Sequence, residues 1–118
     1  MSGPYRVQLR RAKGWRMPDP DNTEKVDHTT RYGNPFIVHD KCKCGAAIGE
    51  VCRKKRRHPG TYIHVATAAE AVERFRATPR SDADVRQARE HLGGRNVACW
   101  CALDQPCHAD VWLEIANG

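Results

Sequence analysis

The residues of this chain best suited to do chemistry are six cysteines, which fall into two groups of three with a histidine near each group. The first group is Cys42, Cys44 and Cys52, with His64 downstream. Three thiols and one imidazole are the ligand count of a closed zinc site, and three thiols cannot all pair as disulfides within one group. The spacing therefore favours zinc as the cofactor, held by Cys42, Cys44, Cys52 and His64.

The second group is Cys99, Cys101 and Cys107, with His108 directly after it. Cys99 and Cys101 are two apart on an expected strand and so share a face. Cys107 falls at an expected helix start, where the helix dipole and free N–H groups stabilise a thiolate. Three interpretations stay open: a reactive site with Cys101 or Cys107 as nucleophile and His108 as base, a second metal site, or core and cap residues.

A strongly basic segment overlaps the first cysteine group. Residues 40–60 contain seven lysines and arginines but two acidic residues, so they carry most of the formal charge of +6. Such a run predicts a phosphate-bearing partner, with a solvated loop as the alternative. No aromatic residue is interleaved, which predicts weakly sequence-specific contact with the backbone of DNA or RNA. The predicted nucleic-acid contacts are Arg53, Lys54, Lys55, Arg56 and Arg57.

Two further residues are candidates for binding a ligand. Arg31 could hold an anion, and Asn34 follows Gly33 in an expected turn. The alternative for Asn34 is a turn residue whose side chain satisfies its own backbone.

The bulk properties predict a small cytoplasmic protein. A chain of 118 residues suggests one domain over 1–118. No apolar run approaches the length of a membrane span, and the first residues lack an apolar signal region, so we expect no membrane partner and no secretion. In a reducing cytosol, clustered cysteines are more often metal ligands or reactive thiols than disulfides.

The elements that must position these groups alternate between strands and helices. Thr67 and Ser81 predict helix starts, and a third helix is expected from Cys107. The order predicts an α/β fold: a small single domain with a short, mostly parallel sheet flanked by helices, plus a zinc-held insert at residues 40–66. A crossover from strand 36–39 to strand 96–100 would make these two strands parallel, which would bring both cysteine groups to one sheet edge. Further strands are expected at 5–11, 25–29 and 62–66.

The stretch CKCGAAIGEVCRKKRRHPGTYIH resembles the short zinc ribbons of actinobacteria and their phages. Cys44, Gly45, Gly49, Cys52 and His64 match that pattern. The first cysteine departs from it, because the ribbons would place it one residue earlier, so a different histidine could complete the site. The candidates for that role are His39 and His58. The resemblance implies that the basic residues meet nucleic acid.

The rest of the chain resembles an uncharacterised domain family common in phages and bacteria. The resemblance rests on RVQLRRAKGWRMP, TTRYGNPF, AAEAVERFR and NVACWCALDQPCHADVWLEIAN. It implies a phage origin, a host-cytoplasmic location and one site built from residues 31–36 and 99–110. It brings no established activity, and typical members lack a segment like residues 40–66.

Taken together, these patterns predict a zinc-binding phage-type protein that contacts nucleic acid through a basic insert. One alternative is an enzyme that acts on a nucleotide-like ligand, with a cysteine nucleophile and Arg31 on the phosphate. Another is a non-catalytic phage factor that binds a host protein.

Overall fold

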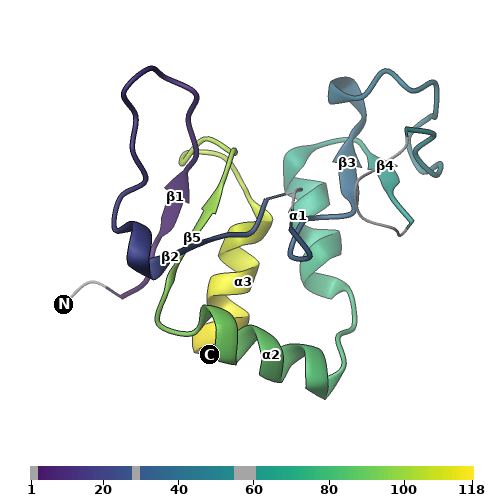
Figure 1. The fold of residues 1–118 in the computed structure, drawn as a ribbon. Coiled ribbons are helices and arrows are strands. Elements are labelled where there is room, and N and C mark those ends of the chain that lie inside the picture. The colour runs from purple at the N-terminus through teal and green to yellow at the C-terminus, as the bar shows by residue number, and fades with distance from the viewer. Residues whose placement is uncertain (1–2, 28–29, 55–60) are drawn as a thin grey trace.

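The structure, a computed structural model, describes residues 3–27, 30–54 and 61–118. Figure 1 shows two small groups of strands with three helices packed beside and below them. The strands are β1 (Arg6–Gln8), β2 (Thr23–Lys25), β3 (Phe36–Val38), β4 (Ile63–Val65) and β5 (Asn96–Cys99). The helices are α1 (Ala68–Ala77), α2 (Asp82–Leu92) and α3 (His108–Asn117), with short 3-10 helices η1 (Pro20–Asn22) and η2 (His39–Lys41).

The strands form two separate parallel sheets. The first has the order β1-β5-β2, and Val97 of β5 pairs with Arg6 on one side and Glu24 on the other. The second consists of β3 and β4, with Ile37 opposite His64. Parallel pairing of all five named strands, with three helices, confirms the predicted small α/β fold.

One prediction about the sheet was wrong. Strands 36–39 and 96–100 were expected to be parallel strands of one sheet, but β3 pairs with β4 and belongs to the second sheet. The physical reason is that β5 is already hydrogen-bonded on both edges, by β1 and β2. No edge of β5 is left for a further strand.

The helices begin where the local signals predict. The Thr67 side chain accepts a hydrogen bond from the Glu70 N–H, and the Ser81 side chain accepts one from the Asp84 N–H. Each satisfies a backbone donor that the first turn of a helix leaves free. The last helix starts at His108 with Cys107 as its N-cap, one residue later than the cysteine start predicted.

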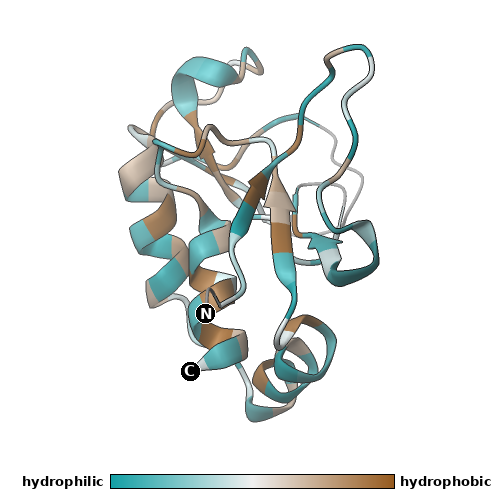
Figure 2. Cartoon of the chain, turned by 90° about the vertical axis from the view of Figure 1, so that its left-hand side faces the viewer, coloured by the Kyte–Doolittle hydropathy of each residue, from teal (hydrophilic) through white to brown (hydrophobic). Residues whose placement is uncertain are grey.

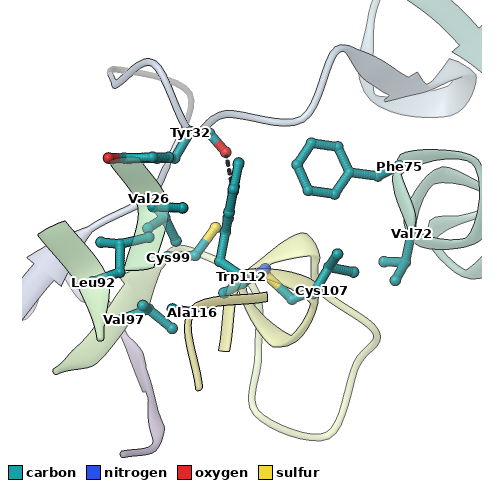
Figure 3. Packing of buried hydrophobic residues seen from close by; sticks show 13 residues of the cluster. Val26, Tyr32, Val72, Phe75, Leu92, Val97, Cys99, Cys107, Trp112 and Ala116 are labelled. Carbon is teal, nitrogen blue, oxygen red and sulfur yellow. Dashed lines mark hydrogen bonds between the residues drawn. The ribbon is translucent and has the colours of Figure 1, made fainter. Parts of the chain in front are cut away.

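The main core lies between the first sheet and the helices. Trp112 of α3 is its centre: the Nε1–H donates to the Tyr32 carbonyl at 2.8 Å, and the ring meets Tyr32 and Phe75 edge-on. Figure 3 shows Cys99 and Cys107 among these buried side chains. Cys99 and Cys107 are therefore inside the packed part of the molecule rather than on a surface loop.

A smaller apolar cluster covers the opposite face of the first sheet. Val7, Leu9 and Ala98 are buried there, with Trp15 and Trp100 packed against them. Figure 2 shows the general pattern, with hydrophobic residues along the strands and on one side of each helix. Within the described residues, no helix is long and apolar enough to cross a membrane.

The segments that follow β3 and β5 lie on the same, upper side of the molecule in Figure 1. The first carries Cys42 and Cys44, and the second carries Cys101 and Cys107. Both cysteine groups thus follow the carboxyl ends of parallel strands, although the two strands belong to different sheets.

Candidate metal centres

Three segments converge to form the first cysteine group. Cys42 and Cys44 follow η2, and His64 lies on β4. Cys52 is held against β4 because its N–H donates to the Tyr62 carbonyl at 2.7 Å. The segment before it runs antiparallel to β4, since the His64 N–H donates to Glu50 and the His64 carbonyl accepts from Gly49.

The donor atoms of this Cys3His group have the spacing of a tetrahedral metal site. The Cys52 Sγ lies 3.7 Å from both the Cys42 Sγ and the Cys44 Sγ, and the Cys44 Sγ lies 3.5 Å from the His64 Nε2. All four atoms lie within 4.8 Å of one another. Around a tetrahedral zinc ion, sulfur atoms are about 3.8 Å apart and a sulfur and a nitrogen about 3.5 Å apart, given the usual bond lengths. Three of the six donor pairs therefore have the spacing of a tetrahedral site, and the group could hold a metal ion.

The backbone after Cys44 turns tightly around its sulfur. Gly45 has φ +93° and Gly49 has φ +88°, both in the left-handed region that glycine adopts without a steric penalty. The turn lets the Cys44 Sγ accept hydrogen bonds from backbone N–H groups, including that of Arg53 at 3.3 Å. Hydrogen bonds from the Ala46 and Arg53 amides lower the pKa of the Cys44 thiol, which favours the thiolate that a metal requires.

His39 lies behind His64 rather than in the group itself. The Nδ1 atoms of the two rings are 3.0 Å apart, and the His64 side chain is fully buried. If the His64 Nε2 binds a metal, its Nδ1 must carry the proton and donate a hydrogen bond to the His39 Nδ1, which then gives the support that a carboxylate or carbonyl usually gives a metal-bound histidine. This arrangement favours His64 over His39 as the imidazole ligand, and His58 lies outside the described residues.

The described part of the basic segment surrounds a groove beside this group. The groove has a volume of about 530 Å³ and is lined by Lys41, Cys42, Lys43, Cys44, Arg53 and Lys54. Two of the predicted nucleic-acid contacts, Arg53 and Lys54, are thus next to two predicted ligands. The other three, Lys55, Arg56 and Arg57, lie outside the described residues.

The second group is a cluster of three thiols at the end of β5. The Sγ atoms of Cys99, Cys101 and Cys107 lie within 4.8 Å of one another, and those of Cys99 and Cys101 are 4.0 Å apart. Cys99 and Cys107 are buried, and Cys101 is partly exposed. None of the six cysteines, all of which lie in the described residues, forms a disulfide. The described residues therefore contain two groups that could hold a metal ion.

His108 is adjacent to this three-thiol cluster but is not one of its close members. Its Nε2–H donates to the Val26 carbonyl, and its Nδ1 lies 3.8 Å from the Cys107 Sγ. The bond to Val26 assigns the proton to Nε2 and leaves the lone pair on Nδ1. The ring is therefore held by the carbonyl of Val26, directly after β2, and its Nδ1 faces the Cys107 thiol as a hydrogen-bond acceptor.

The thiols of the cluster influence one another strongly. Hydrogen bonds from Cys107 and Cys99 lower the pKa of Cys101 to about 3, and the positive charges of Arg6 and Lys41 act in the same direction. Hydrogen bonding to Cys101 and Cys107, together with burial, raises the pKa of Cys99. Within the cluster, these interactions favour the Cys101 thiolate over the Cys99 thiolate.

Arg31 and Asn34 are placed differently from the cysteine groups. Both ends of the Asn34 amide are used within the chain, since its Nδ2 donates to the Ala71 carbonyl and its Oδ1 accepts from the Phe36 N–H. Arg31 lines a pocket of about 190 Å³ together with Arg80 and Trp112. These contacts tie Asn34 to the turn and to α1, and a ligand-binding role for either residue stays a prediction.

Sequence reasoning missed Arg6, whose side chain is 8% exposed. It donates to the carbonyls of Ala102 and Leu103 at 3.2 and 2.7 Å, and these residues directly follow Cys101. The alternation of residues 5–11 suggests a strand but cannot reveal that β1 lies beside β5. Only that pairing brings Arg6 to the three-thiol cluster.

Comparison with known proteins gives one match. Residues 7–118 match the model of a family described as a domain of unknown function, DUF4326. No curated protein and no solved structure matches the chain.

Proposed function

The chain belongs to the family that its residues 7–118 match, and for this member we propose a zinc-dependent function in nucleic-acid binding. Zinc bound by the Cys3His group holds the basic segment in shape, and the cations of that segment contact phosphates of DNA or RNA. The observation that supports the metal is the spacing of the four donor atoms, at 3.5 to 3.7 Å for three of their pairs and within 4.8 Å for all of them. Zinc rather than a harder ion suits a donor set of three thiolates and one imidazole.

The charge around the site supports a phosphate-bearing partner. Lys41, Lys43, Arg53 and Lys54 line one groove, so four cations lie around a single hollow next to two metal ligands. A bound metal would fix their positions relative to one another, because Lys43 lies between two ligands and Arg53 directly follows a third. Cations fixed in this way could contact successive phosphates without ordering a free loop on binding.

The composition of the groove indicates what kind of binding to expect. None of its lining residues is aromatic, so it offers no surface on which bases could stack. Contacts of this kind position a protein on the nucleic-acid backbone but carry no sequence information. We therefore propose binding that weakens steeply with salt and discriminates little between sequences.

The experiment measures binding to a fluorescent single strand and a duplex as a function of salt. The test variant carries Lys43→Ser, Arg53→Ser and Lys54→Ser. A matched variant carries Lys13→Ser, Arg16→Ser and Arg86→Ser, which removes the same charge from exposed residues outside the basic segment. Each lost phosphate contact should reduce the slope of log K against log salt by about 0.7 to 0.9.

The expected result is a clearly flatter slope for the groove variant alone, with the zinc content of both variants equal to that of the wild type. Equal slopes for the two variants would contradict a role of the groove. No binding by the wild type at low salt would refute nucleic-acid contact and leave the metal site standing. Capture of a host protein that is insensitive to nuclease would then favour the alternative of a host-binding factor.

A further inference from the structure

The three-thiol cluster has the geometry of a metal site that lacks its fourth ligand. Its three sulfur atoms lie within 4.8 Å of one another, and the 4.0 Å between Cys99 and Cys101 is close to the spacing around a tetrahedral zinc ion. The sulfurs come from β5, from the loop after it and from the N-cap of α3, so rigid elements hold at least two of them. Closed structural sites have four protein ligands, whereas sites that bind an outside ligand usually have three.

We propose that Cys99, Cys101 and Cys107 bind a second zinc ion whose fourth position takes a small anion from solution. This site is separate from the Cys3His group, where His64 fills the fourth corner, and it does not depend on nucleic-acid binding. The described residues would thus combine one closed centre and one open centre.

His108 does not fill the open corner. In the Cys3His group, the four candidate ligand atoms all lie within 4.8 Å of one another. At the three-thiol cluster, only the three sulfurs form such a set, and His108 is not part of it. Its Nε2–H is engaged by the Val26 carbonyl, which fixes the ring with its Nδ1 near the Cys107 sulfur.

The charges beside the cluster explain why the outside ligand would be an anion. The Arg6 side chain is almost fully buried, and its Nη2 is bonded to the loop that follows Cys101. Its Nη1 has no hydrogen-bond acceptor among the described residues, although the Asp110 carboxylate lies 3.4 Å away. Lys41 adds a second positive charge near Cys101. A buried donor without an acceptor is costly, so an anion that accepts from Arg6 would be favoured.

The position of the cluster in the fold agrees with ligand binding. It follows the carboxyl end of β5, the central strand of the parallel sheet β1-β5-β2. Ligands of parallel α/β sheets bind outside the carboxyl ends of the strands. Cys101 is partly exposed, so the cluster has a side from which a small ligand could enter.

The test uses the full chain loaded with Co²⁺, whose visible absorption reports the number and kind of ligands, and azide as the anionic probe. In the Cys52→Ser chain the first centre is disabled, and we expect one cobalt ion with thiolate-to-metal absorption that changes when azide is added. In the Cys101→Ser chain we expect one cobalt ion at the Cys3His group and no response to azide. His108→Ala should keep both the second cobalt ion and the azide response.

Three results would overturn the proposal. The first is a wild-type chain that binds no more cobalt than the Cys101→Ser chain. The second is a second cobalt ion whose absorption azide does not change. The third is loss of that ion in His108→Ala, which would mean a closed site with His108 as fourth ligand. If Cys52→Ser fails to fold by circular dichroism, the comparison of wild type with Cys101→Ser decides the same question.

Discussion

At the scale of single residues, the contact between His39 and His64 decides how firmly the imidazole ligand is held. The two Nδ1 atoms are 3.0 Å apart, and the rings meet edge-on with centroids 5.2 Å apart. His64 is fully buried, so its ring has no water to replace this partner. We therefore propose that His39 positions His64 in the Cys3His group and is not itself a ligand.

Removing this support should weaken metal binding without removing a ligand. We expect His39→Ala to lower zinc affinity about 10- to 100-fold, the usual effect of losing such a partner. His39→Asn is the matched control, because its side-chain oxygen can accept the same hydrogen bond and should keep most of the affinity. Competition with a chromophoric chelator measures both variants. Equal affinities for the wild type and both variants would show that His39 does not orient His64.

At the scale of elements, the turn after Cys44 connects backbone geometry to metal binding. Gly45 is in the left-handed region at φ +93°, and the same turn directs N–H groups at the Cys44 sulfur. A Cβ at Gly45 would meet only the Arg53 side chain at 3.5 Å, an ordinary contact. The cost of a side chain here is therefore the backbone conformation itself.

Gly45→Ala should consequently lower both the stability of the turn and the affinity for zinc. The left-handed conformation costs a residue with a Cβ roughly 1–2 kcal/mol. Gly14→Ala is the control, since Gly14 has φ +81° and open space around it but lies away from both cysteine groups in the sequence. Chelator competition should show weaker zinc binding only for Gly45→Ala. An unchanged zinc affinity in both variants would mean that the turn does not shape the site.

Elements with local signals could be predicted from the sequence, and long-range pairings could not. The caps at Thr67 and Ser81 and the convergence of Cys42, Cys44, Cys52 and His64 follow from residue types and spacing. The division into two sheets depends on which strands pair with β5. The hydrophobic periodicity of the sequence carries no information about that pairing. For the same reason the sequence could not place Arg6 beside the thiols.

At the scale of the whole molecule, the segments that carry the two cysteine groups lie on one side (Figure 1). Lys41 directly precedes Cys42 of the first group, and its charge acts on Cys101 of the second. The match to DUF4326 over residues 7–118 spans both groups. We propose that residues 40–66 form the zinc-held insert and that the rest of the chain folds around the sheet β1-β5-β2. A ligand at the three-thiol cluster and a nucleic acid on the groove would then share one face.

The zinc content per chain, measured by plasma mass spectrometry on protein purified without chelator, tests whether the Cys3His group binds the metal. We expect Cys52→Ser to hold one zinc ion fewer than the wild type, while Cys101→Ser keeps the ion of the Cys3His group. The same zinc content in Cys52→Ser and the wild type, or no zinc in either, would contradict this expectation.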